Sequence, residues 1–250
     1  MIVSRKKIME MNMNNTINEL TERKSVRVYT EQTISPEMKK AILEAAVQAP
    51  TAGNQQLYTI LDITSQELKE TLSETCDHQP FIAKAQMVLI FCADCQKWYD
   101  AYKVGNCMPR KPEAGDLMLA VTDAAIAAQN AVTAAHSLGI GSCYIGDIME
   151  QCERHRELLQ LPSYVFPAVM LVFGYPTEQQ KQRKKPKRCD LKYIVHENGY
   201  HRLTEKELKE MLEQEDKNFE DWIQAFCKRK YNSDFSKEMS RSVKEYLKKF

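Results

Sequence analysis

GDLMLAVTDAAIAAQNAVTAAHSLGIGSCYIGDI, residues 115–148, is the stretch of this sequence that most constrains the fold. From Leu117 to Leu138 it is rich in alanine and apolar on almost every side. This pattern predicts a helix buried on most faces, either inside one subunit or at a subunit interface. Gly139 follows at the position where glycine commonly ends a helix. The stretch therefore predicts one long central helix followed by a glycine-rich segment.

Shorter segments around this helix carry strand and helix patterns in alternation. Ser35 as N-cap and Pro36 at the first helical position predict a helix that ends at Pro50, and Ser65 caps a further helix. β-Branched, aromatic and continuously apolar runs predict strands. The strands are too few for a doubly wound sheet, so the predicted fold class is α+β. The strand runs are residues 57–64, 85–94 and 164–176.

The chain changes character from about Thr204. Charged segments with sparse apolar residues, Trp222 and Leu247 among them, follow as far as the C-terminus. They predict helices that lie as arms on another surface, such as a partner subunit. We therefore expect a main domain over residues 14–200 and a helical C-terminal extension over residues 201–250.

Composition excludes several classes of protein. The formal net charge of +1 over 250 residues argues against a dedicated nucleic-acid binder. No uninterrupted apolar run approaches the ~18 residues that a membrane span needs, and the first residues lack the apolar core of a signal peptide. We therefore expect a cytoplasmic protein with neither a nucleic acid nor a membrane as partner.

The eight cysteines are expected to be reduced thiols, since no export signal accompanies them. Cys92 and Cys95 form a CxxC pair. A zinc site would need a second pair, and a redox motif would need a thioredoxin-like setting, so we interpret both as cysteines at a strand end. We expect no metal site.

Four polar clusters are candidates for ligand binding. The stretch ERKSVRVYT, residues 22–30, holds Arg23, Lys24, Ser25 and Arg27, and the others are residues 51–56, residues 139–147 and the basic run 183–188. Each alone also fits a solvated face, a turn or a helix end. Together they suit a phosphorylated heterocycle, because basic groups clamp a phosphate, amides match ring donors and acceptors, and glycines let the backbone approach a flat ring.

Several familiar catalytic signatures do not occur in this chain. The sequence has no GxSxG elbow, no GxxxxGK[ST] loop and no HExxH, and GIGSCYIG is not GxGxxG because its third glycine comes too late. His136, on the predicted central helix, fits a core histidine better than a catalytic one. The chemistry is therefore expected to come from a bound group.

Four segments in order resemble the FMN-dependent nitroreductase superfamily, and most of all its flavin-reductase-like, oxygen-insensitive branch. They are ERKSVRVY, APTAGNQQLY, DAAIAAQNAVTAAHSLGIGSCYIGDI and VFGYP followed by KKPKR, and they span about residues 18–188. The resemblance implies a nitroreductase-like α+β homodimer with an antiparallel-rich central sheet flanked by helices. It also implies two FMN sites in the dimer interface, and C-terminal extensions that wrap the partner.

The resemblance also assigns roles to single residues at the phosphate end of FMN. Arg23, Lys24 and Ser25 would hold the phosphate and the ribityl chain, and Arg27 would approach the N1 and O2 edge of the flavin. A basic pair would close on the phosphate, either Lys185 with Lys187 or, one residue later, Lys187 with Arg188. Lys187 stands where the family usually has Arg, so that contact would be a point charge rather than a fork.

Two further segments would contact the flavin ring. The first lies on a loop from the other subunit, and the second has its backbone facing N5 and O4. The family often continues the loop with Pro and Trp, where this chain has Leu57 and Tyr58, so that wall is expected to differ in shape. The loop residues are Thr51, Ala52, Asn54 and Gln56, and the second segment is Tyr144, Ile145 and Gly146.

The resemblance implies an FMN-dependent NAD(P)H oxidoreductase that reduces nitroaromatics, quinones or flavins by ping-pong hydride transfer. NADPH or NADH would be the co-substrate and a small molecule the electron acceptor. The alternative is a flavin-binding protein of the same fold with another acceptor chemistry, such as dehalogenation or dehydrogenation, or with no turnover. Lys228, Arg229 and Lys230 could meet the 2′-phosphate of NADPH, or they could form a solvated helix end.

Overall fold

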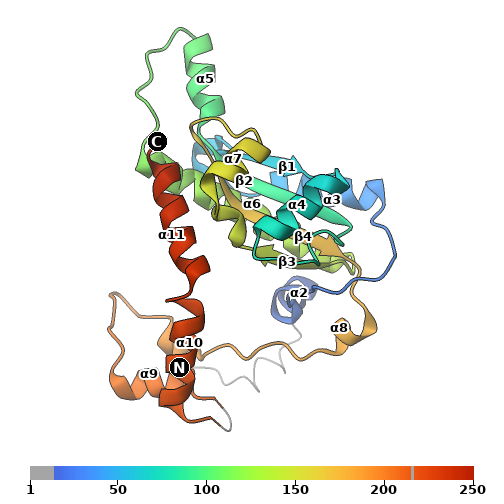
Figure 1. Cartoon of the computed structure of the whole chain (residues 1–250), viewed down its shortest axis with the longest axis vertical. Helices are drawn as coiled ribbons and strands as arrows, with labels where there is room; N and C mark the ends of the chain where they lie inside the picture. Colours follow the sequence, from blue (N-terminus) through green and yellow to red (C-terminus); the bar gives the residue numbers. More distant parts are fainter. Residues whose placement is uncertain (1–13, 215–216) are drawn as a thin grey trace. The chain divides into compact units, whose positions relative to one another are not determined.

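The computed structural model describes residues 14–214 and 217–250 (Figure 1). It divides into two compact units. The first consists of the chain up to Arg183 together with residues 238–250, and the second of Lys184–Lys237. The first unit holds the sheet and the predicted central helix.

The first unit is built on a four-stranded antiparallel sheet in the order β1-β2-β4-β3, where β1 is Tyr58–Asp62, β2 is Met87–Asp94, β3 is Gly141–Ile145 and β4 is Val165–Gly174. The two central strands, β2 and β4, are almost completely buried, which explains their continuously apolar sequences. Pro167 lies in β4 where the register with β2 shifts, next to Cys92. A bulge tolerates proline there because the ladder bond that proline cannot donate is already interrupted.

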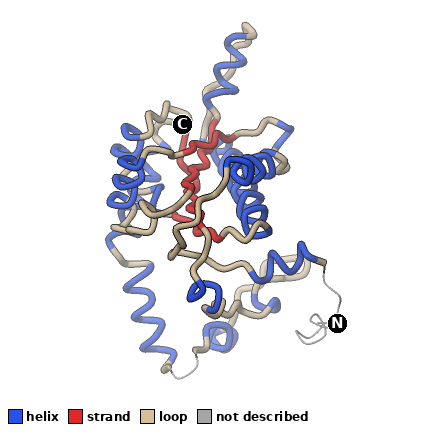
Figure 2. The backbone as a smooth tube through the Cα atoms, turned by 90° about the vertical axis from the view of Figure 1, so that its right-hand side faces the viewer, coloured by secondary structure: helices blue, strands red, loops and turns tan. Residues whose placement is uncertain are grey.

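Helices cover both faces of this sheet (Figure 2). The central helix is α6, Ala114–Ser137, and α3, Pro36–Val47, packs beside it. Asn130 of α6 donates to the carbonyl of Ala45 in α3 at 3.1 Å. The remaining elements of the unit are α2 (Asn15–Glu22), η1 (Ala52–Asn54), α4 (Gln66–Thr75), α5 (Gln96–Val104), η2 (Asp147–Met149), α7 (Cys152–Leu158) and α8 (Glu178–Gln182).

Within a single chain α6 is buried on one side only. Its stripe of small residues, which includes Ala120, Ala124 and Ala127, is fully buried, whereas Met118 and Leu119 are 66% and 52% exposed. In the described parts of the chain, α6 is the one helix long and apolar enough to cross a membrane. Polar Thr, Asp, Gln and Asn residues lie within α6, so its sequence contains no continuous apolar run. Its buried stripe makes it the core helix of this unit.

The glycine-rich segment after α6 forms an edge strand. Gly139 ends the helix with a φ of 74°, and residues 141–145 then pair with β4 as β3. Residues 25–30 run along the outside of this edge, where the Val26 N–H donates to the Ser142 carbonyl at 2.9 Å. A Cβ on Gly141 would lie 2.5 Å from Val26 Cγ2, so only glycine allows this approach.

The C-terminal segment forms helices, as predicted. The second unit contains η3 (Leu191–Tyr193), α9 (Glu205–Leu212) and α10 (Phe219–Lys230). The last helix, α11 (Asp234–Leu247), begins in the second unit and ends in the first. There Tyr246 is fully buried and packs edge-on against Phe166 of β4, with ring centroids 4.9 Å apart. For residues 238–250, then, the surface that receives the predicted arm includes the chain's own β4.

Candidate flavin site

Arg23 lies at the end of α2, where the backbone turns from helical to extended. Its guanidinium sits over the Tyr144 ring, 5.6 Å from the centroid. The Nε and Nη2 atoms of Arg23 are buried and have no hydrogen-bond partner. Buried donors are rarely left unpaired in proteins, and such cases call for an explanation such as a bound group. Arg23 is therefore suited to bind an anion.

Lys24 and Ser25 are tied to the end of α8. The Lys24 ammonium donates to the carbonyls of Lys181 and Arg183, both at 2.5 Å. In return, Arg183 Nη2 donates to the Ser25 carbonyl at 2.6 Å. Because an ammonium carries three N–H donors, Lys24 keeps one for a ligand. These bonds hold the segment after α2 in one position beside β3.

Arg27 continues this segment with its side chain exposed. The Arg27 backbone N–H donates to Gln180 Oε1 at 3.3 Å, and the guanidinium lies 5.7 Å above the centroid of the Phe81 ring. The backbone is thus fixed while the charged group stays at the surface, where it can meet a ligand.

Tyr144, Ile145 and Gly146 occupy the end of β3 and the residue after it. The Tyr144 hydroxyl donates to Gln129 Oε1 of α6 at 3.1 Å. Burial raises the pKa of Tyr144 to about 12, an effect that the Arg23 charge partly opposes. Ile145 is buried and Gly146 is exposed, so the backbone is accessible at the point where the strand ends.

The loop with Thr51, Ala52, Asn54 and Gln56 is held by a residue that sequence analysis missed. Asp123 of α6 is 3% exposed and accepts the backbone N–H groups of Ala52 at 3.0 Å and Leu57 at 3.2 Å. An aspartate in the middle of an alanine-rich helix is the signal that could have revealed it, because a buried carboxylate needs partners.

The loop itself has an unusual backbone. Gly53, Asn54 and Gln56 have φ values of 57°, 57° and 50°, in the left-handed region. Thr51 Oγ1 accepts the Gln56 N–H at 3.2 Å and closes the turn. Side chains rarely adopt this conformation without support, and its concentration in one short loop is typical of a ligand-binding segment.

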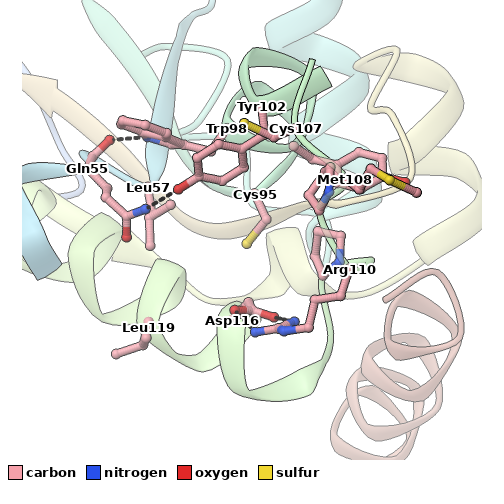
Figure 3. A pocket seen from close by; sticks show the side chains of 13 residues that line it. Gln55, Leu57, Cys95, Trp98, Tyr102, Cys107, Met108, Arg110, Asp116 and Leu119 are labelled. Atoms are coloured by element: carbon pink, nitrogen blue, oxygen red, sulfur yellow. Dashed lines mark hydrogen bonds and ion pairs between the residues drawn. The ribbon is translucent and has the colours of Figure 1, made fainter. Parts of the chain in front are cut away.

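A cavity of about 500 Å³ adjoins this loop (Figure 3). Sequence analysis did not predict it. It lies between α5, the return loop after α5 and the start of α6, with Gln55 and Leu57 at its edge. The Trp98 Nε1–H donates to the Gln55 carbonyl at 2.6 Å. The predicted loop and the cavity therefore share one residue, Gln55.

The structure brings the predicted residues together in two groups rather than one. Arg23, Ser25 and Tyr144 lie at the β3 edge of the sheet, whereas residues 51–57 lead into β1 at the opposite edge. Three strand spacings separate β1 from β3, which amounts to about 14 Å. Lys185, Lys187 and Arg188 belong to the second unit, on a stretch without regular secondary structure.

The cysteines form no disulfide, and all eight have free thiols. Cys92 lies in β2 and Cys95 directly follows that strand. Burial, reinforced by nearby carboxylates, raises the pKa of each thiol to about 12, which makes both unreactive. Across residues 14–214 and 217–250, no three His, Cys, Asp or Glu side chains are grouped so as to hold a metal ion.

Comparison with known proteins shows to which family this chain belongs. Residues 20–175 match the nitroreductase family. The chain is 30% identical to an FMN reductase (NADPH) of Bacillus subtilis over 93% of both chains, and 35% identical to an oxygen-insensitive NADPH nitroreductase of Salmonella typhimurium over 81% of both. It superposes on the NfrA1 nitroreductase structure from B. subtilis with a TM-score of 0.75 and 29% identity, covering 90% of this chain and 98% of that one. The chain therefore belongs to the nitroreductase family and is an NAD(P)H-dependent flavin oxidoreductase of that family.

Proposed function

We propose that this protein is a homodimeric enzyme that holds FMN between its subunits and transfers electrons from NADPH or NADH to a small aromatic acceptor. Nitroaromatics, quinones and free flavins are the acceptor classes. The observation that carries this proposal is the separation of the two predicted residue groups to opposite edges of the sheet. The two groups are separated in one chain by the width of the sheet, and two chains related by a twofold axis can bring them to one ring.

The group at the β3 edge has the chemistry that a phosphate requires. Arg23 offers two buried nitrogen atoms without partners, and Lys24 retains one N–H. Ser25 adds a hydroxyl on a backbone that the Arg183 bond fixes. An arginine fork and an ammonium next to each other suit a phosphate monoester. Lys185 and Lys187, or Lys187 and Arg188, would add charge from the second unit.

The flavin ring would lie beyond this anchor. Tyr144, Ile145 and the exposed Gly146 would present backbone groups to one edge of the ring, and Arg27 would bring its charge to the N1 and O2 edge. Thr51, Ala52, Asn54 and Gln56 of the partner subunit would close the other side. Asn54 and Gln56 of that loop, which Asp123 holds, are exposed.

The proposed dimer also accounts for the unburied side of α6. Met118 is exposed in one chain although it belongs to the most apolar helix of the sequence. Burying apolar surface of this kind contributes about 25 cal/mol per Å², so a second copy is the natural cover. Of the predicted extension over residues 201–250, the part before residue 238 would add an arm to the same assembly.

The protein's part in the reaction is positioning and electrostatics. FMN, when bound, would supply the hydride and electron chemistry. Arg27 would stabilise negative charge at one edge of the ring, and such a preorganised charge contributes about 3 to 4 kcal/mol in a site that excludes water. The charged anchor at Arg23 and Lys24 binds without taking part in the electron transfer.

The visible absorption spectrum of the purified protein tests this proposal. We expect a yellow protein whose flavin band bleaches when NADPH is added without oxygen and returns when a nitroaromatic or a quinone follows. A colourless protein that takes up no added FMN would overturn the proposal. A yellow protein that NADPH does not bleach would instead support the alternative, a flavin-binding protein with other chemistry or no turnover.

A further inference from the structure

The cavity beside residues 51–57 has one wall made by a single face of α5. Trp98, Tyr99 and Tyr102 lie on one face of the helix, Cys95 caps its start, and the cavity they border measures about 500 Å³. This lies within the range of small-molecule sites, which are mostly apolar with few polar groups. The opposite side is formed by the return loop and by Asp116 and Leu119 of α6 (Figure 3).

Gln55 fixes the two rings of this wall that it touches. Its carbonyl accepts the Trp98 indole N–H at 2.6 Å, and its Nε2 donates to the Tyr102 hydroxyl at 3.4 Å. The ring centroids of Trp98 and Tyr102 are 5.6 Å apart with planes tilted by 46°. Because the polar edges of both rings are already used by Gln55, their apolar faces remain to stack against a flat ligand.

The charged side chains of the lining cancel each other. Arg110 donates to Asp116 with both terminal nitrogens, Nη1 to Oδ2 at 2.6 Å and Nη2 to Oδ1 at 2.9 Å. The hydrogen bond from Arg110 lowers the pKa of Asp116, so the pair stays ionised and has no net charge. An anionic ligand would have to take Arg110 from this bidentate partner, and a neutral ligand would not.

We propose that this cavity is the acceptor site and that it selects an uncharged flat aromatic acceptor over an anionic one such as a phosphorylated flavin. This inference rests on the proposed function, because Gln55 joins the cavity to the loop assigned to the flavin. It narrows the acceptor to neutral nitroaromatics and quinones. Selection comes from stacking on Trp98 and Tyr102 and from the neutral Arg110–Asp116 pair.

Tryptophan fluorescence tests the cavity independently of turnover. The chain has two tryptophans, so Trp222→Phe leaves Trp98 as the reporter. Para-nitrobenzamide and para-nitrobenzoate have the same shape and differ by one charge. We expect saturable quenching of Trp98 with a Kd at least about tenfold lower for the neutral amide, since a charge loses hydration on entering an apolar cavity. Equal affinity, or quenching that does not saturate, would overturn the proposal.

Two substitutions separate stacking from charge. Tyr102→Leu removes one ring and should raise the Kd for para-nitrobenzamide about tenfold. Val104 lies on the same helix, is 84% exposed and is outside the cavity lining, so Val104→Ala should leave this Kd unchanged. Asp116→Asn frees the charge of Arg110 and keeps an oxygen for the Glu113 N–H. It should shift the preference toward para-nitrobenzoate, and an unchanged Kd ratio would contradict the role of the pair.

Kinetic measurements on the FMN-loaded enzyme test whether the cavity serves the reaction. With saturating NADPH, Tyr102→Leu should lower kcat/KM for para-nitrobenzamide about tenfold relative to Val104→Ala, in a protein whose flavin NADPH still bleaches. Failure of bleaching in every variant would refute the proposed function and leave the fluorescence result standing. Normal bleaching with an unaltered kcat/KM in Tyr102→Leu would refute the acceptor site alone.

Discussion

The carboxylate of Asp123, in the buried face of α6, accepts the backbone N–H of Ala52 at 3.0 Å and so attaches the loop assigned to the flavin to the central helix. Its second oxygen accepts the N–H of Leu57 at 3.2 Å. One buried side chain thus holds both ends of a loop that carries three left-handed residues. The geometry of that loop depends on α6 and not on its own sequence alone.

Asp123→Ala should both destabilise the protein and loosen this loop. Two hydrogen bonds to a charged acceptor are lost and two amides are left without partners, so we expect a loss of about 3 kcal/mol in the free energy of unfolding. Urea unfolding measures this change, and a flavin titration measures the loosening as weaker FMN affinity. The exposed Asp100 on α5 is the control, and Asp100→Ala should change stability by no more than about 0.5 kcal/mol. Equal effects of the two substitutions would refute the role of Asp123.

The close approach of residues 25–30 to β3 predicts opposite effects for two glycines. Gly141→Ala should destabilise by about 1 to 3 kcal/mol, because the new Cβ would meet Val26 Cγ2 at 2.5 Å. Gly115→Ala should stabilise by up to about 1 kcal/mol, since Gly115 lies in α6 and has nothing within 4 Å of an added Cβ. Thermal unfolding measures both changes. Adding Val26→Ala to Gly141→Ala should restore part of the loss, and no recovery would place the strain elsewhere.

Glu150 predicts a pH dependence of stability. It is 4% exposed, its Oε1 has no partner, and burial next to Asp147, Asp77 and Glu238 raises its pKa to about 7. The folded state therefore holds a proton that the unfolded state releases near pH 4.3, so this contribution is full below about pH 4 and is lost as the pH rises to about 7.

Glu150→Gln removes this proton linkage. Relative to the wild type, it should raise the free energy of unfolding by about 1 to 3 kcal/mol at about pH 8 and have little effect at about pH 4. Urea unfolding at both pH values measures the difference. Glu157→Gln, at an exposed position of α7, is the matched control and should show no such pH trend. A Glu150→Gln effect independent of pH would mean that Glu150 titrates normally.

Arg27 should tune the flavin. Arg27→Ala should weaken FMN affinity about tenfold and make the flavin midpoint potential more negative, because a cation near the N1 and O2 edge is removed. A reference-dye titration measures the potential and a fluorescence titration the affinity. Arg154→Ala, at an exposed position of α7, should change neither value. If Arg27→Ala keeps the wild-type potential and affinity, the assignment of Arg27 is wrong.

The last turn of α10 predicts a nucleotide preference. Lys228, Arg229 and Lys230 end this helix, and the Arg229 guanidinium lies 5.5 Å from the centroid of the Phe226 ring. Replacing all three with alanine should raise KM for NADPH about tenfold and leave KM for NADH unchanged, since only NADPH carries the 2′-phosphate. The exposed Lys206→Ala is the control. Equal changes in KM for both nucleotides, or no change, would mean that these residues form a solvated helix end.

The sequence by itself determined the central helix, three of the four strands, the helix caps at Ser35 and Ser65, and the family. These features depend on local periodicity and on short motifs, which are written along the chain. The edge strand β3 was not predicted because Gly141, which suggests a turn, is required by the approach of Val26 from a distant part of the chain.

Only the tertiary structure decided how the binding groups are distributed. Asp123, Trp98 and Gln55 come together from α6, α5 and a loop, and no spacing in the sequence links them. The sheet order β1-β2-β4-β3 places the two predicted groups at opposite edges. Strand order follows from packing between distant segments, so local patterns along the chain could not place the two groups at opposite edges, although the family resemblance implied a loop from another subunit.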